Sequence, residues 1–111
     1  MEIASRILTL HEDGQESTIP IRLSAPQQRD ARAWSCCYEI GWPEGKKARE
    51  VWGFDSFQAI ILALQAISTD IYTSTYHKSG NLFFDAPGRG YGFPVPVNLR
   101  DLLIGDDAKY F

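Results

Sequence analysis

The segment Phe54–Tyr76 constrains the fold most strongly, because it has the pattern of one long helix. Asp55 stands at the N-cap position, and Gln58 completes a capping box three residues later. Large residues at helical spacing predict one buried stripe, which consists of Phe57, Ile60, Ile61, Leu64, Ile67 and Ile71. The other side is small or apolar, with Ala59, Leu62, Ala63 and Ala66. Asp70 is the only charge between Ser56 and Tyr76, so we expect this helix to be covered on more than one side.

Alternating apolar residues predict four strands before the helix, at Ile3–Leu10, Thr18–Ser24, Ala33–Trp42 and Lys47–Gly53. The stretch Ala25–Arg32 is expected to be a surface loop. Further segments are expected after the helix: a strand at Asn81–Ala86, an extended stretch at Phe93–Val97, a short helix at Leu99–Ile104 and a docking tail at Asp106–Phe111. Short polar turns join the early strands, and such connections favour antiparallel pairing.

These elements predict an α+β fold in a single domain over residues 1–111. Its sheet is an antiparallel meander of about four strands plus a later one, packed against one long helix. An extended C-terminal arm with a short helix completes it. A half-barrel that curls round the helix is the alternative.

The composition argues against several partners. There are 14 acidic and 11 basic residues, and the resulting charge of −3 does not favour binding to DNA or to an anionic membrane. The adjacent Cys36 and Cys37 point to opposite faces of a strand, which favours free thiols in the reducing cytoplasm. No motif for a cofactor or a metal is present, so we expect neither.

Four segments carry a resemblance to a known family: IASRILTL, WSCCYEI, DSFQAIILALQ and YGFPVPV. Together they resemble a family of short bacterial proteins of unknown function, which are similar in length to this chain. The resemblance implies a stand-alone bacterial domain in the cytosol. It implies no catalytic residues, because the family has no established activity.

The segment Arg89–Phe93 (RGYGF) matches an RNA-binding signature in which aromatic rings stack on bases. Pro94 and Pro96 argue against it, because a central strand needs backbone donors at such positions. A tight loop that leads into a proline-held extended segment is the favoured interpretation. Arg89, Tyr91 and Phe93 remain candidates for binding a small ligand or single-stranded RNA.

The tryptophans are stronger candidates than the ionisable residues. Trp34 and Tyr38 are expected in the core, whereas Trp42 and Trp52 are equally compatible with the core and with an exposed partner surface. A small hydrolase-like enzyme that uses His77 with a carboxylate such as Asp85 is a minority hypothesis. No catalytic residue is assigned.

The leading hypothesis is a non-enzymatic interaction module, such as an adaptor, an inhibitor or an immunity-type protein, with an unknown protein partner. We also expect a homodimer, in which the C-terminal arm and the tryptophan-bearing sheet edge make the contacts. The small-residue side of the helix is expected to be covered by the arm of the same chain, since intramolecular cover costs no translational entropy.

Overall fold

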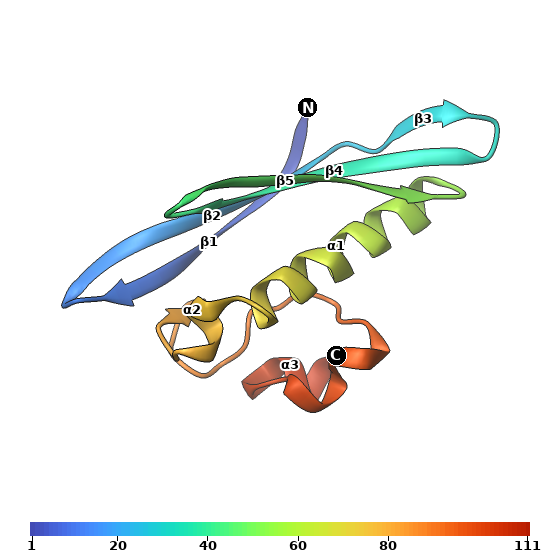
Figure 1. The fold of residues 1–111 in the computed structure, drawn as a ribbon. Coiled ribbons are helices and arrows are strands. Elements are labelled where there is room, and N and C mark those ends of the chain that lie inside the picture. The colour runs from blue at the N-terminus through green and yellow to red at the C-terminus, as the bar shows by residue number, and fades with distance from the viewer.

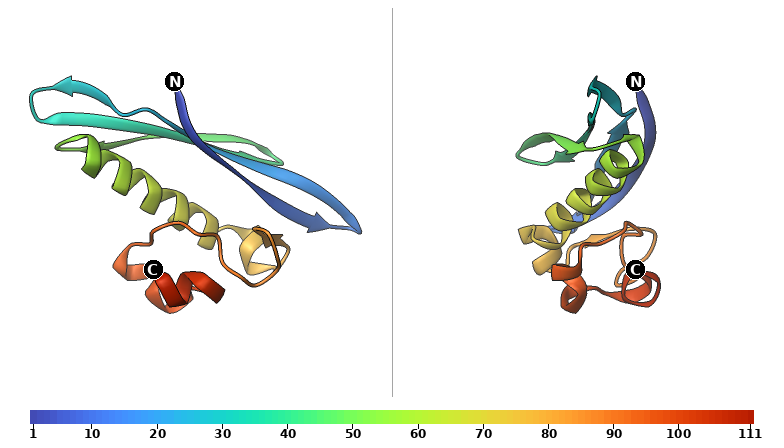
Figure 2. Two further views of the ribbon diagram at one scale, coloured as in Figure 1. Left: turned by 180° about the vertical axis from the view of Figure 1, so that it is seen from behind. Right: turned by 90° about the vertical axis from the view of Figure 1, so that its right-hand side faces the viewer.

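The structure is a computed structural model that describes all 111 residues, Met1–Phe111, and it has three layers (Figures 1 and 2). A six-stranded antiparallel sheet lies on top, one helix crosses beneath it, and the C-terminal part of the chain lies below that helix. The strands are β1 (Glu2–Glu12), β2 (Gln15–Ser24), β3 (Gln27–Asp30), β4 (Ala33–Trp42), β5 (Gly45–Gly53) and β6 (Leu82–Phe83). The helices are α1 (Ser56–Tyr72), α2 (Thr75–Lys78), α3 (Gly105–Tyr110) and the 3₁₀ helix η1 (Val97–Leu102). The α+β class is therefore confirmed.

Strand β4 is at the centre of the sheet. It pairs with β5 on one side and with β2 and β3 on the other, and β1 and β6 follow beyond β2. All pairs are antiparallel. The expected loop at Ala25–Arg32 was wrong in part, because Gln27–Asp30 forms β3. Its polar side chains are exposed at the sheet edge, where pairing needs only the backbone.

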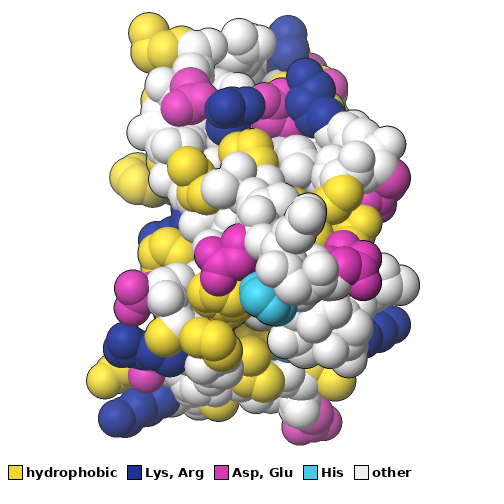
Figure 3. Space-filling model, turned by 90° about the vertical axis from the view of Figure 1, so that its left-hand side faces the viewer, with side chains coloured by type: hydrophobic (Ala, Val, Ile, Leu, Met, Phe, Trp, Pro, Cys, Tyr) yellow, Lys and Arg dark blue, Asp and Glu magenta, His cyan; other side chains and the backbone are white.

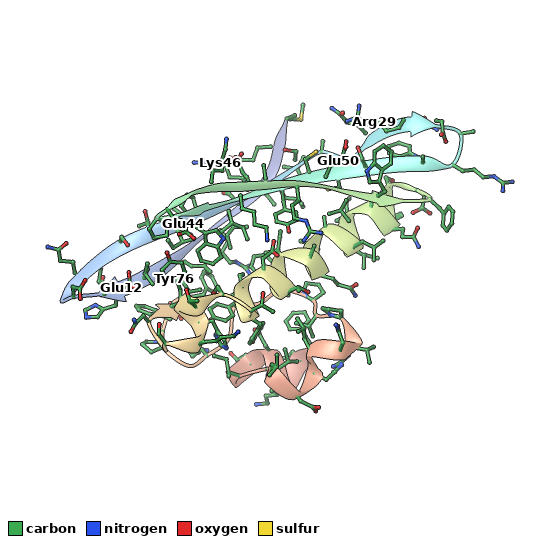
Figure 4. All side chains as sticks on the ribbon, in the orientation of Figure 1. Glu12, Arg29, Glu44, Lys46, Glu50 and Tyr76 are labelled. Atoms are coloured by element: carbon green, nitrogen blue, oxygen red, sulfur yellow. The ribbon has the colours of Figure 1, made fainter.

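The inner face of the sheet forms most of the core, as the alternation predicts. Its buried residues are Leu8, Leu10, Ile19, Ile21, Leu23, Cys36, Tyr38 and Ile40. The outer face is polar, and Figure 4 shows Arg29, Lys46 and Glu50 on the side away from α1. Ion pairs connect its strands, such as Arg29 to Glu50 at 2.9 Å. The sheet is thus covered on one face only.

The single helix Phe54–Tyr76 was wrong in its length. The capping box is present, because Asp55 accepts a hydrogen bond from the Gln58 backbone N–H at 2.8 Å. However, α1 ends at Tyr72, and a separate turn, α2, follows. Ser74 accepts a hydrogen bond from the His77 backbone N–H at 3.1 Å and so caps α2. Serine and threonine at Thr73–Thr75 compete with helical hydrogen bonding, which explains the break.

The predicted buried stripe of α1 was also wrong in part. Ala59 and Ala63 are completely buried, whereas Phe57 is 77 % exposed and Ile61 is 48 % exposed. The reason is the close approach of helix and sheet: a Cβ atom at Gly53 would lie 2.5 Å from the Ala59 backbone nitrogen. Only small residues fit at such a distance, so the alanines face the sheet and push the larger residues outward.

The C-terminal part covers the second half of α1. Phe93, Val95 and Leu99 are buried there, and Ser68 donates a hydrogen bond to the Pro94 carbonyl at 2.8 Å. The expected strand Asn81–Ala86 is reduced to Leu82–Phe83, which pairs with β1. The expected helix Leu99–Ile104 is the 3₁₀ helix η1, and most of the expected tail is helix α3. None of the helices is sufficiently long and apolar to cross a membrane.

Candidate functional site

The clearest candidate surface is a group of exposed apolar side chains where β5 passes into α1. We call it the apolar end, and it consists of Trp52, Phe54, Phe57, Ile61 and Leu62. Phe54 is 74 % exposed, and even Leu62, the least exposed member, is 37 % exposed. Part of the group borders a shallow hollow of about 430 Å³ whose walls include Trp52, Phe54 and Leu62. Exposed groups of this kind mark interaction surfaces.

Local geometry explains why these residues are exposed. Trp52 pairs with Ser35 on the outer face of the sheet, so its ring points away from α1. The capping box fixes the start of the helix, and Gln58 accepts a hydrogen bond from the Phe54 N–H at 2.7 Å. This close turn leaves the Phe54 ring outside the helix. Phe57 and Ile61 then follow on the side of α1 opposite to the buried alanines, and Leu62 lies on the flank between the two sides.

The two candidate tryptophans are not brought together. Trp52 belongs to the apolar end, but Trp42 lies near the opposite end of the β4–β5 pair, where it faces Gly45. Trp42 is partly buried and stacks on Tyr76, with ring centroids 5.2 Å apart. The Tyr76 hydroxyl donates a hydrogen bond to Glu44 at 2.6 Å, and Figure 4 labels both residues. Trp42 therefore joins the sheet to α2.

The RGYGF residues do not form one exposed surface. Arg89 is exposed and pairs with Asp85 at 3.2 Å and with Asp106 at 3.4 Å. Tyr91 and Phe93 are buried, so their ring faces pack against protein. Base stacking needs accessible rings. The hypothesis that Tyr91 and Phe93 stack on RNA therefore gains no support from this geometry.

A buried polar network holds the segment around Tyr91 and Gly92. The Asp107 carboxylate accepts hydrogen bonds from the Tyr72 hydroxyl at 2.5 Å and from the Tyr91 and Gly92 backbone N–H groups at 2.8 Å each. His77 Nδ1 lies 2.5 Å from the Tyr91 hydroxyl. Burial raises the pKa of Tyr91 and lowers that of His77, because desolvation disfavours both charged forms. The network fastens the C-terminal segment to α1 and α2.

The hydrolase hypothesis gains no support from the position of His77. Its ring contacts Tyr72 and Tyr91, whereas Asp85 is exposed and pairs with Arg89. His77 borders none of the cavities found in the structure. No group of three or more histidine, cysteine or acidic side chains is placed to hold a metal ion.

A second charged centre escaped the sequence analysis. Asp70 is buried beneath β5, where it accepts hydrogen bonds from Tyr38 and from Lys47 Nζ, the latter at 2.9 Å. Arg49 Nη1 lies 3.6 Å from the same carboxylate. The isolated position of Asp70 in an otherwise uncharged helix was the available signal. Its partners could not be identified without the register of β4 and β5.

Figure 3 shows the face of the molecule that lies on the left in Figure 1. Charged and apolar side chains are mixed on this face, and hydrophobic side chains gather in its lower part.

In a comparison with known proteins, the model of a domain of unknown function, DUF6968, matches residues 4–95. No curated protein and no solved structure matches the chain. The matched region begins inside β1, contains β2–β6, α1 and α2, and ends before η1. The expectation of a family of unknown function is thus confirmed: the chain belongs to the DUF6968 family.

Proposed function

We propose that this protein is a non-enzymatic interaction module of the bacterial cytosol, which forms a homodimer through its apolar end. The observation that carries the proposal is the exposure of five large apolar side chains at the junction of β5 and α1: Trp52 on the strand, Phe54 in the connection, and Phe57, Ile61 and Leu62 on the helix. Tryptophan and phenylalanine are enriched at the centres of interfaces, where their large surfaces are removed from water.

The uneven cover of α1 supports this interface. The C-terminal segment covers the second half of the helix, where Ser68 bonds to Pro94. Phe57 and Ile61 continue the same side toward the N-terminus of the helix, and no segment of the chain covers them. A partner would extend this cover along α1. The sequence led us to expect dimer contacts through the C-terminal arm and the tryptophan-bearing sheet edge. The surface proposed here does not include the arm, but Trp52 on edge strand β5 belongs to both surfaces.

A second copy of the chain is the proposed occupant. Two copies related by a two-fold axis would each bury the apolar end of the other, and this symmetry is the commonest among homo-oligomers. Lys46, Lys47 and Arg49 lie along β5, and charged residues on an edge strand oppose strand-to-strand pairing. The contact therefore uses side chains at the end of β5. An adaptor, inhibitor or immunity-type function would then act through the dimer.

The test compares the mass of the wild-type protein with that of Phe57→Glu by light scattering during size exclusion. We expect two chains of 12.5 kDa for the wild type and one for the variant. Phe57 is 77 % exposed, so the substitution should leave the fold intact. Val97→Glu is the matched control, since Val97 is an exposed apolar residue outside the apolar end. A wild-type mass of one chain at all concentrations contradicts the proposal.

A further inference from the structure

A separate cavity of about 240 Å³ lies where β1, α1 and the segment Gly92–Pro94 meet. Most of its wall is apolar and includes Ile21, Leu23, Leu64, Ile67 and Phe93. None of the lining residues belongs to the apolar end. The volume is below the roughly 300–1,000 Å³ that is usual for drug-sized ligands. The cavity is therefore suited to a small molecule with an apolar body.

One cationic side chain, Arg6, borders this cavity and is held firmly. Its Nη1 atom donates to the Tyr91 carbonyl at 2.8 Å and to the Gly92 carbonyl at 3.0 Å. Its guanidinium carbon lies 4.5 Å from the centre of the Phe84 ring and 4.8 Å from that of Phe93. The two rings and the two carbonyls fix the plane of the guanidinium before any ligand arrives, which lowers the entropy cost of binding.

Arg6 has no anionic partner within the protein. It takes part in none of the ion pairs, and the nearby Asp107 is already engaged by Tyr72 and two backbone N–H groups. Burial lowers the pKa of the Arg6 guanidinium, because desolvation disfavours its charge. An anion placed beside it would offset that cost.

The remaining donors of Arg6 are free for such an anion. Nε and Nη2 have no hydrogen-bond partner, since both protein bonds of the side chain use Nη1. No fully buried side-chain nitrogen in the structure lacks a partner. Nε and Nη2 must therefore be accessible from outside, on a residue that is itself only partly exposed and lines the cavity.

We propose that this cavity binds a small monocarboxylic acid, whose carboxylate pairs with Arg6 and whose apolar body lies against Leu64, Ile67 and Phe93. The planar guanidinium matches a carboxylate with two parallel hydrogen bonds. A single cation balances a monoanion. The apolar wall offers no second charge for inorganic phosphate, and it removes the hydrocarbon part of the acid from water.

Three probes test the ligand class: sodium hexanoate, hexan-1-ol and inorganic phosphate. Each is titrated into the isotope-labelled protein, and the backbone amide signals of Gly92 and Phe93 are followed by NMR. We expect saturable shifts with hexanoate. Hexan-1-ol should bind at least about tenfold more weakly, because it lacks the charge-assisted hydrogen bonds, and phosphate should cause no saturable shift. Equal binding of acid and alcohol, or no shift with hexanoate, overturns the proposal.

Two sets of variants locate the site. Arg6→Gln should abolish hexanoate binding, and Arg6→Lys should weaken it, because lysine keeps the charge but loses the planar pair of donors. Since Arg6 also fastens two carbonyls, circular dichroism must show that these variants are folded. Leu64→Trp is independent of Arg6 and fills the cavity. Its control is Leu102→Trp, at an exposed residue outside the cavity.

We expect Leu64→Trp to lose hexanoate binding and Leu102→Trp to keep it. Unchanged binding in folded Arg6→Gln or in Leu64→Trp would contradict the assigned site. The outcome is separable from that of the proposed dimer, because Phe57→Glu leaves every lining residue of the cavity in place.

Discussion

At the scale of single residues, Asp107 shows how one buried carboxylate organises a segment with little regular structure. It accepts hydrogen bonds from two backbone N–H groups of the Tyr91–Gly92 segment and from the hydroxyl of Tyr72 on α1. A carboxylate only accepts hydrogen bonds, so it suits three donors. The carboxylate also requires glycine at position 90, because a Cβ atom at Gly90 would lie 2.6 Å from the Asp107 carboxyl carbon.

Asp107→Asn should therefore destabilise the protein by about 2–3 kcal/mol, because the amide NH₂ group would face a backbone donor and leave it unsatisfied. Urea unfolding followed by circular dichroism measures the change. Asp106→Asn is the matched control, since the neighbouring carboxylate is exposed and only pairs with Arg89. It should change the free energy of unfolding by about 0.5 kcal/mol or less. Equal effects of the two variants would contradict the assigned role of Asp107.

His77 gives the molecule a defined dependence on pH. Burial lowers its pKa from the usual 6.5 in the folded protein. As the pH falls below about 6.5, the unfolded chain therefore binds more protons at this residue than the folded protein does. The free energy of unfolding should fall over this range by at most about 1.4 kcal/mol per pH unit.

The contribution of His77 is measured by comparing urea unfolding at pH 7.5 and pH 5.5 in wild type and in His77→Gln. The variant should lose less stability than the wild type between the two values. His11→Gln, on the exposed β1–β2 hairpin, is the control and should behave as the wild type does. If His77→Gln and wild type respond identically, the residue is not held neutral by the fold.

At the scale of elements, α1 is where the sequence was most informative and also most misleading. The capping pair Asp55 and Gln58 correctly located its start. The side that faces the sheet was not predictable, because size alone suggested that the large residues are buried. The close contact between Gly53 and Ala59 depends on how β5 meets the helix, and no local pattern encodes that contact.

The strands were more predictable than the helix face. Alternation located β1, β2, β4 and β5, since the side-chain period of a strand is fixed by its backbone. Strand β3 was missed, because its polar residues carry no alternation. The candidate surface was also found only in part: Trp52 was named, whereas the large size of Phe57 and Ile61 caused both to be assigned to the core.

The orientation of α1 predicts that enlarging a small residue destabilises the protein more than truncating a large one. Ala63→Leu should destabilise the protein by about 2 kcal/mol, because the buried contact with the sheet has no room for three more carbon atoms. Ile61→Ala, on the exposed side, should cost about 0.5 kcal/mol or less when it is measured in the Phe57→Glu background, which removes the proposed dimer contact. Urea unfolding of both variants decides the matter. A larger loss for Ile61→Ala would mean that the helix is rotated relative to this description.

At the scale of the whole molecule, the shape is elongated, with extents of 50 × 28 × 19 Å. The β1–β2 and β3–β4 hairpins extend in opposite directions (Figure 1). The outer face of the sheet is linked by exposed ion pairs, such as those that Glu39 makes with Arg22 and Lys46. Such pairs add little stability but keep the face hydrated. Of the apolar end, only Trp52 lies on this outer face of the sheet, whereas Phe57, Ile61 and Leu62 lie on α1 beneath it.

The most direct test of the proposed dimer is an isotope-filtered NOESY experiment on an equimolar mixture of labelled and unlabelled protein. It detects only contacts between different copies. We predict cross-peaks from the methyl groups of Ile61 and Leu62 to the aromatic protons of Trp52, Phe54 or Phe57 of the other copy. Their absence, or cross-peaks that come instead from Val97 and Leu102, would contradict the central claim that the apolar end joins two copies of this chain.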